Sequence, residues 1–187
     1  GDWSSDVCSS DLISEISGQE IPEVKDTQID LPINAFIPAT WILNREEKLE
    51  AYKSATECSN NDELTELATD WVNRYGNLPK PVESLIMIMR LKLLAKKCGF
   101  NKIKLKKPNI LIETKLKNST FKILKSSLAS SVQNKFIFDE GEQSSIITIR
   151  GLGATEIQNQ IDQLMLWFGS FEREIKNFNK ELIIKRE

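Results

Sequence analysis

The side chains that most often carry out acid–base or metal chemistry are scarce in this chain. It has no histidine, and its three cysteines, Cys8, Cys58 and Cys98, are isolated from one another. Without a C-x-x-C pair, neither a zinc site nor a disulfide framework is expected, and free thiols suit a reducing, cytoplasmic compartment. One G-x-G occurs, at residues 151–153 between an expected strand and an expected helix, where a tight turn is a more common use than phosphate binding.

Adjacent carboxylates, the other candidates for acid–base work, occur at Glu46-Glu47 and at Asp62-Glu63. Each pair falls in the first turn of an expected helix, where negative charge interacts favourably with the helix dipole. A structural role therefore accounts for both pairs. The sequence predicts a chain that is not an enzyme and has no catalytic, cofactor-binding or metal-binding residue.

Lysines dominate the middle of the chain, although the formal net charge is −2. Residues 90–125 contain 12 bases and one acid, Glu113. Within them, Lys102, Lys104 and Lys106 alternate with apolar residues, so one face of a strand would present three ammonium groups that can neutralise phosphates. Two interpretations stay open: a solvated strand face, or a nucleic-acid contact that lacks the arginines and aromatic residues of base-reading surfaces.

The apolar periodicity predicts an α+β fold: a single compact domain whose small mixed or antiparallel sheet packs with several amphipathic helices. The length of 187 residues, with 40% hydrophobic and 28% charged residues, suits about one soluble domain plus a tail. No apolar run approaches the ~18–20 residues of a membrane span. Expected strands cover residues 24–31, 103–105, 110–112, 136–138 and 145–150, and expected helices cover residues 45–57, 61–75, 82–98, 120–132 and 157–178.

The helix expected at residues 61–75 has the clearest amphipathic pattern. Six apolar residues follow the spacing of one buried helix face: Leu64, Leu67, Ala68, Trp71, Val72 and Tyr75. Asn60 precedes this helix as an N-cap with Glu63 three residues later, and Asn44 with Glu47 repeats the pattern one helix earlier. Gly76 follows at the position of a left-handed residue that ends a helix.

Two longer segments keep a characteristic order and spacing. The first, VKDTQIDLPINAFIP at residues 24–38, is an alternating strand followed by a loop expected to carry Phe36, Ile37 and Trp41 into the core. The second, NRYGNLPKPV at residues 73–82, ends one helix at a glycine and opens the next with a proline. Over about residues 20–176, the chain resembles the C-terminal domain of bacterial transcription-repair coupling factors.

That resemblance implies a regulatory domain of a larger protein. The parent would be an ATP-dependent double-stranded DNA translocase that displaces stalled RNA polymerase and recruits the excision-repair protein UvrA. ATP and Mg²⁺ would bind in its motor domains, and this domain would need no cofactor. In the resting state it would dock onto the UvrB-homology module of the same polypeptide and mask the UvrA-binding surface, as a monomer with no membrane contact.

The family's docking helix uses two acidic residues and an arginine, at positions that match Asp70, Asn73 and Arg74 here. Asn73 departs from the acidic pattern, because an amide can hydrogen-bond an arginine but adds no Coulomb attraction. We therefore expect the charged contact to be weaker or to shift onto Asp70 and Glu66. The residues alone favour a solvated helix flank at this face, and only the resemblance favours an interface. The alternative function is a free-standing basic nucleic-acid-binding module that uses residues 90–125.

The first residues are expected to lie outside the domain. Residues 2–12 (DWSSDVCSSDL) show no periodicity and correspond codon for codon to one frame of a common sequencing-adapter oligonucleotide. We expect residues 1–12 to be an artefactual disordered tail and residues 13–23 a remnant of the upstream motor domain and linker. Residues 24–178 would then form the regulatory domain, and residues 179–187 a frayed C-terminal tail.

Deleting residues 1–12 is expected to leave the melting temperature unchanged within error, because no apolar pattern ties them to a core. Calorimetry on the full and shortened chains measures the difference. A drop of several degrees would show that these residues pack against the domain.

Overall fold

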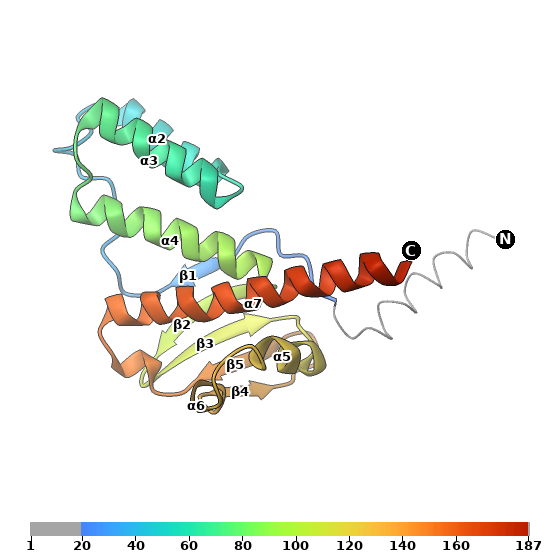
Figure 1. Ribbon diagram of the computed structural model, residues 1–187. Coiled ribbons are helices and arrows are strands. Elements are labelled where there is room, and N and C mark those ends of the chain that lie inside the picture. Colours follow the sequence, from blue (N-terminus) through green and yellow to red (C-terminus); the bar gives the residue numbers. More distant parts are fainter. Residues whose placement is uncertain (1–19, 187) are drawn as a thin grey trace.

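A five-stranded mixed sheet forms the centre of the molecule (Figure 1). In the computed structural model, which describes residues 20–186, the strands lie in the order β1-β2-β3-β5-β4. β1 pairs in parallel with β2, and the other neighbouring strands are antiparallel. The strands are β1 (Gln28–Asp30), β2 (Phe100–Lys106), β3 (Asn109–Thr114), β4 (Phe136–Asp139) and β5 (Ser145–Ile149). The predicted α+β class with a small mixed sheet is confirmed.

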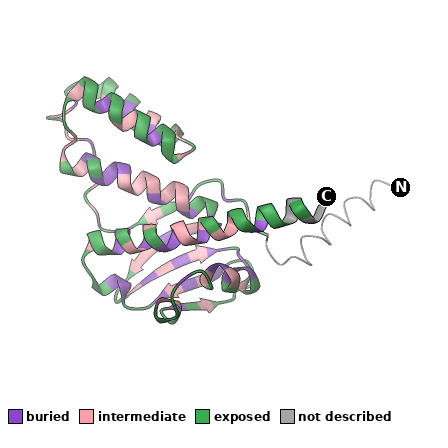
Figure 2. Ribbon diagram, viewed as in Figure 1, coloured by how far each residue is buried: buried purple, intermediate pink, exposed green. Residues whose placement is uncertain are grey.

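Helices pack on one face of this sheet and extend beyond it as a helical hairpin (Figure 1). They are α2 (Arg45–Glu57), α3 (Asn61–Tyr75), α4 (Lys80–Lys97), α5 (Asn118–Lys125), α6 (Ser130–Gln133) and α7 (Ile157–Arg186), with the 3-10 turn η1 (Leu152–Ala154). In Figure 2, exposed positions line the outer sides of α2 and α3, whereas buried positions run along the strands and α4.

The main core lies between the sheet, α4, α5 and α7. Aromatic rings fill much of it: Phe100 of β2 lies 4.9 Å from Phe168 of α7, and Phe121 of α5 lies 6.0 Å from Phe171 of α7, between ring centroids. Alternating residues of the strands, such as Ile103, point into this core and are fully buried. Ring packing of this kind adds to the burial of apolar area, so sheet and helices form one rigid layer pair.

A second, smaller core holds the α2–α3 hairpin against α4. The N-terminal half of α4 contributes Val82, Leu85 and Ile86 to it, and the C-terminal half contributes Leu91 and Ala95 to the main core. α4 is therefore apolar on nearly all sides because two cores use it, as its sequence predicts for a central helix.

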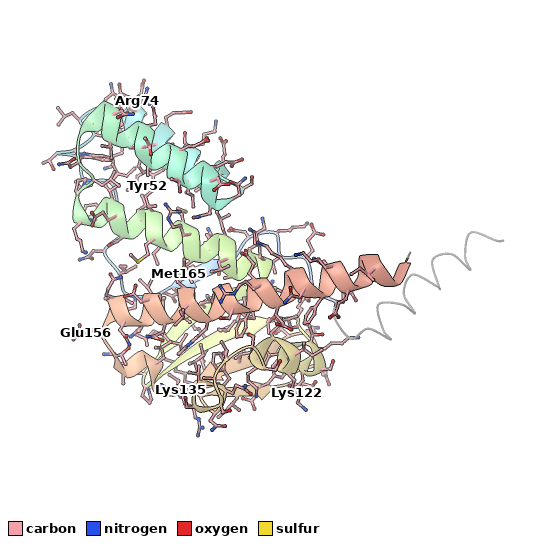
Figure 3. All side chains as sticks on the ribbon, viewed as in Figure 1. Tyr52, Arg74, Lys122, Lys135, Glu156 and Met165 are labelled. Carbon is pink, nitrogen blue, oxygen red and sulfur yellow. The ribbon has the colours of Figure 1, made fainter. Side chains whose placement is uncertain are left out.

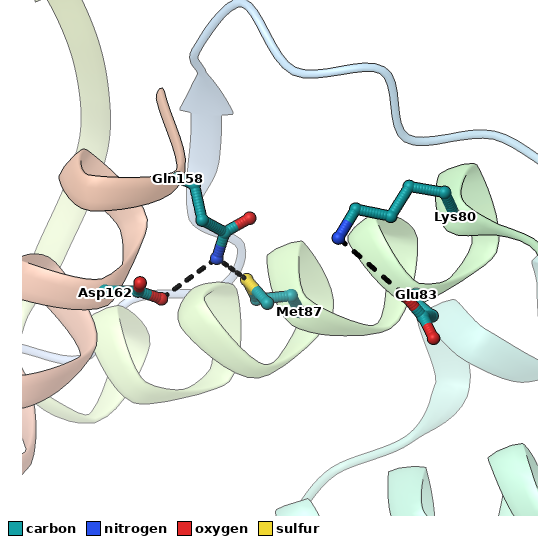
Figure 4. Close-up of polar contacts among 5 residues, drawn as sticks. All are labelled: Lys80, Glu83, Met87, Gln158 and Asp162. Atoms are coloured by element: carbon teal, nitrogen blue, oxygen red, sulfur yellow. Dashed lines mark hydrogen bonds and ion pairs between the residues drawn. The ribbon is translucent and has the colours of Figure 1, made fainter. Parts of the chain in front are cut away.

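Polar contacts fix α7 against α4. Lys97 of α4 forms an ion pair with Glu172 of α7 at 3.2 Å. At the other end of the helix pair, the Gln158 side-chain amide lies 3.4 Å from the Met87 sulfur and donates to Asp162 at 3.0 Å (Figure 4). These contacts lock the register of the two helices.

The predicted helix caps of the hairpin are confirmed. The Asn44 Oδ1 accepts from the Glu46 and Glu47 amides at 2.8 Å and 3.2 Å, and the Asn60 Oδ1 accepts from the Glu63 amide at 2.9 Å. Gly76 has the expected positive φ of 89°, but its ψ of −171° is extended rather than helical. Its amide still donates to a carbonyl of the last turn of α3.

Some boundaries differ from the predicted ones. β1 is shorter than the strand predicted at residues 24–31, because the Thr27 hydroxyl turns to donate to the Phe100 carbonyl at 2.8 Å. Phe36 was expected in the core and is 45% exposed; Ile37 beside it takes the inward position, with its amide bonded to Tyr52 Oη. Trp41 is half-buried.

The helix predicted at residues 120–132 is two helices, α5 and α6. Between them, the hydroxyls of Ser126 and Ser127 donate to the carbonyls of Ile123 and Leu124 at 2.5 Å and 2.7 Å. Serine side chains that bond nearby carbonyls compete with the helical pattern, so the helix ends there. The backbone of α7, by contrast, stays helical to Arg186, through most of the segment predicted to fray.

The expected tail at residues 1–12 and residues 13–19 of the expected upstream remnant lie outside the described residues. The domain boundaries at residues 24 and 178 stay predictions. Among residues 20–186, no helix combines the length and the apolar character that crossing a bilayer requires.

Trp71→Ala is expected to lower the free energy of unfolding by roughly 3–5 kcal/mol, as for other large-to-small core changes. Trp71 is 1% exposed, and its ring lies 6.2 Å from that of Trp41, edge to face. Urea denaturation measures the loss.

The neighbouring residue provides the control. Val72 follows Trp71 on α3 but is 37% exposed, so Val72→Ala should change the free energy of unfolding by about 0.5 kcal/mol or less. If Trp71→Ala cost well under 1 kcal/mol, the apolar stripe of α3 would not be part of a core.

Candidate docking face on helix α3

The apolar stripe of α3 orients its charged residues outward. Trp71 anchors the helix in the smaller core with 1% exposure, and Leu64 two turns earlier is buried as well, with 0% exposure. The other side of the helix carries all four residues predicted to form an interface, and all four are exposed: Glu66, Asp70, Asn73 and Arg74. Figure 3 shows Arg74 at the outer end of the hairpin, far from the sheet. We call these four residues the α3 docking face.

Two residues of this face pair with each other. The Arg74 guanidinium lies 3.6 Å from the Asp70 carboxylate, one turn along the helix, and the side chains are 62% and 55% exposed. Exposed pairs with this spacing contribute only ~0.3–0.5 kcal/mol. Both charges are therefore available to a partner at little cost to the fold.

Asp70 and Arg74 also line a small cleft between α2 and α3, with a volume of about 120 Å³. The Tyr75 hydroxyl closes one side of the cleft by donating to Glu47 Oε2 at 3.3 Å, and the Arg74 guanidinium lies 5.8 Å from the Tyr75 ring centroid. Loss of water contact, and then the Glu47 carboxylate, raise the pKa of Tyr75. The phenol therefore stays a neutral donor near neutral pH.

Sequence reasoning missed two acids of this cleft, Glu47 and Glu50 of α2. The sequence assigns Glu47 only to the first turn of α2, where it is stabilised by the helix dipole. The usable signal was the short connection at residues 58–60, because a short link makes the two helices antiparallel and brings the start of α2 beside the end of α3. Glu66 and Asn73 share the exposed side of α3 without lining the cleft.

The three lysines of β2, Lys102, Lys104 and Lys106, are less exposed and more closely paired with acids than the sequence predicts. Lys102 lies opposite Glu113 of β3, and the Lys104 ammonium forms an ion pair with the same carboxylate at 3.6 Å. Asp30 of β1 is the strand neighbour of Lys104 on the other side. Lys102 and Lys104 are half-buried and Lys106 alone of the three is exposed, so the expected face of three ammonium groups open to solvent is wrong.

The two described cysteines are poor nucleophiles. Burial, and then the carboxylates of Glu63 and Glu57, raise the pKa of the Cys58 thiol. Cys98 is fully buried in the main core, and burial, followed by Glu172, raises its pKa as well. Since the thiolate is the reactive species, neither group is activated for chemistry.

The glycine pair at residues 151–153 forms a tight turn. Gly151 adopts a left-handed conformation with φ of 77°, and its amide donates to Asn109 Oδ1 at 3.1 Å. A Cβ on Gly153 would lie 2.6 Å from the Asn109 carbonyl oxygen. The Gly151 amide already donates to Asn109 and is not available to a phosphate. The glycines instead allow η1 to pack closely on β3.

The TRCF domain family model matches residues 31–124, half of the chain. The chain belongs to the TRCF domain family. The matched segment runs from the loop after β1, through the α2–α3 hairpin and α4, to α5. The resemblance predicted from the sequence is thus confirmed, and the α3 docking face lies inside the matched segment.

Individual relatives of this TRCF domain are transcription-repair-coupling factors. That of Mycobacterium bovis is 33% identical over 81 residues, which cover 43% of this chain and 7% of the relative. That of Bacillus subtilis is 32% identical over 95 residues, which cover 46% of this chain and 8% of the relative. That of Borreliella burgdorferi is 32% identical over 95 residues, which cover 50% of this chain and 8% of the relative. The matching part of the chain therefore spans less than a tenth of the length of these relatives.

The fold of the whole TRCF domain also has a solved counterpart. It is similar to a crystal structure of the C-terminal domain of transcription-repair coupling factor, with a TM-score of 0.65 and 17% sequence identity. The similarity covers 84% of this chain and 99% of that one. The architecture of sheet, hairpin and α7 is therefore shared with that domain.

Gly153→Ala is expected to lower the free energy of unfolding by ~1–3 kcal/mol, the usual range for inserting atoms into a packed site. The added methyl group would meet backbone atoms of Asn109, which cannot rotate away. Thermal or urea unfolding measures the change.

Gly169→Ala is the matched control, since Gly169 lies within α7 and a Cβ there meets nothing within 4 Å. This second variant should be ~0.5–1 kcal/mol more stable, as for glycine replaced in a helix interior. Equal effects of the two substitutions would contradict the packing role of Gly153.

Proposed function

We propose that this TRCF domain is a non-catalytic, autoinhibitory domain of a longer transcription-repair coupling factor. In the resting state, the α3 docking face contacts the UvrB-homology module of the same polypeptide and masks the surface that binds UvrA. The observation that carries the proposal is the exposed, weakly paired charge of Asp70 and Arg74 on a helix that the buried side chains of Leu64 and Trp71 hold in place.

Closure by this face needs only a modest contact. A partner on the same polypeptide is present at an effective concentration in the millimolar range when a short flexible linker joins the two. The Asp70–Arg74 pair can exchange its internal contact for partner charges without disturbing the stripe that holds α3. A rearrangement of the parent on DNA would then release the domain.

The charge around the face favours a partner surface with basic residues. Glu47 and Glu50 of α2 add two carboxylates beside Asp70 at the cleft, and Glu66 adds a third one turn away on α3. Arg74 is the cation among them. These three carboxylates replace part of the negative charge that the neutral amide of Asn73 does not supply.

The parent, on this proposal, is an ATP-dependent double-stranded DNA translocase that displaces stalled RNA polymerase and brings UvrA to the lesion in transcription-coupled repair. ATP and Mg²⁺ act in its motor domains. This domain supplies control of partner access in a monomeric, cytoplasmic protein.

The proposal is tested by reversing the charges of the face, Asp70→Lys together with Arg74→Glu, in the full-length parent. Loss of a close charged contact worth ~1.5 kcal/mol raises the open-to-closed ratio about tenfold. UvrA pull-down without DNA or ATP should therefore increase. Asn73→Asp should act in the opposite direction and lower this basal binding.

The matched control reverses another exposed pair, Lys80→Glu with Glu83→Lys at the start of α4, where the charges lie 4.0 Å apart (Figure 4). This control should bind UvrA as the unmodified parent does. If the Asp70/Arg74 variant also bound UvrA at the unmodified level while unfolding at the same temperature, the α3 docking face would not hold the parent closed.

A further inference from the structure

A second charged surface lies at the other end of the molecule, around α5 and α6. Residues 114–138 contain five lysines and no aspartate, glutamate or arginine. We call these lysines the α5–α6 basic surface: Lys115, Lys117, Lys122, Lys125 and Lys135. The sequence-based candidates on β2 did not include them, although residues 90–125, which the alternative function uses, contain four of the five.

The fold turns these lysines outward. Phe121 and Leu124 bury the inner side of α5 in the main core, with 1% and 0% exposure. Four of the five lysines are exposed and Lys125 is half-buried. Figure 3 shows Lys122 and Lys135 along one edge of the sheet layer, whereas Arg74 lies at the far end of the hairpin. The basic surface is thus separate from the α3 docking face.

The charge of this surface is not compensated within the domain. Each of the six ion pairs among the described residues involves other cations, such as Lys97 with Glu172 and Lys104 with Glu113. Asp139, the last residue of β4, and the acidic residues of the loop after it form no ion pair with these lysines in the part of the chain that the structure describes. A polyanion that approaches α5 therefore meets lysines that no ion pair of residues 20–186 neutralises.

We propose that the α5–α6 basic surface binds the phosphate backbone of duplex DNA without reading its sequence. Lysine is a point charge that contacts phosphates without the forked geometry used to read bases. The rings of Phe121 and Phe136 nearby are buried and cannot stack on single-stranded bases, and Phe138 is half-buried against Phe121. Hydroxyl and amide side chains at Ser119 and Asn134 are exposed between the lysines and add neutral phosphate donors.

The dimensions of the surface suit a duplex. α5 has eight residues and so spans about 12 Å. A DNA duplex carries one charge per ~1.7 Å of its axis, or about seven phosphates over that length. The lysines on and beside α5 can therefore meet different phosphates at the same time.

The test is fluorescence anisotropy with a labelled duplex of random sequence and the full 187-residue chain. The variant Lys122→Gln/Lys125→Gln/Lys135→Gln should bind at least ~10-fold more weakly at 0.1 M salt. The slope of log K against log salt should become shallower by about 0.9 for each phosphate contact removed. Circular dichroism confirms that the variant is folded.

The matched control, Lys25→Gln/Lys53→Gln/Lys80→Gln, removes the same net charge from exposed sites on other elements. It should keep the affinity and the salt slope of the unmodified chain. Equal weakening by the control would overturn the proposal, because net charge alone would then explain binding. Unchanged binding by the α5–α6 variant would also overturn it.

Competition identifies the ligand class. Unlabelled duplex should displace the labelled duplex, whereas polyglutamate and anionic phosphatidylserine vesicles at equal charge should not. Displacement by polyglutamate or vesicles as effective as that by duplex would overturn the assignment to DNA. Tighter binding of a single strand of the same length would overturn the assignment to a duplex.

Discussion

The structure depends on the packing of one helix, α4, into two hydrophobic cores at once. Its first half closes the smaller core with Val82 and Ile86, and its second half closes the main core with Leu91 and Ala95. A polar residue would be buried on almost any side of this helix, which is why its sequence is apolar nearly all round. Because α4 is a single rigid rod, the orientation of the hairpin relative to the sheet is set by the register of its side chains.

This arrangement separates the charged surfaces of the molecule. Acidic residues gather on the hairpin at one end, around the α3 docking face, and uncompensated lysines gather around α5 at the other end. Surfaces of opposite sign on one small domain would attract each other if the linking element were flexible. The shared helix keeps them apart, so each can engage its own partner, and the weak internal pairing of Asp70 with Arg74 adds no constraint.

Local patterns in the sequence predict most of this fold. The caps at Asn44 and Asn60 and the hairpin of β4 and β5 depend on residues close in sequence, and both are present. The predicted stripe on α3 is buried or half-buried at five of its six positions, and Val72, at its edge, is exposed instead. The predictions are wrong where contacts between residues distant in the sequence determine the orientation or the exposure of a side chain. Phe36 points outward because the Ile37 amide donates to Tyr52, and Lys104 of β2 forms an ion pair with Glu113 of the next strand. The candidate site was predicted in part: its α3 residues followed from a motif, whereas its α2 acids follow from the pairing of α2 with α3, which only the short connection between the two helices indicates.

The burial of Cys98 gives the molecule an internal reporter. Its thiol lies between α4 and α7 with no exposed surface, whereas Cys58 at the end of α2 is partly exposed. A thiol reagent in solution can therefore react with Cys58 in the folded state but can reach Cys98 only when the main core opens. The labelling rate of Cys98 relative to that of Cys58 therefore reports opening of the main core, with no cysteine introduced by mutation.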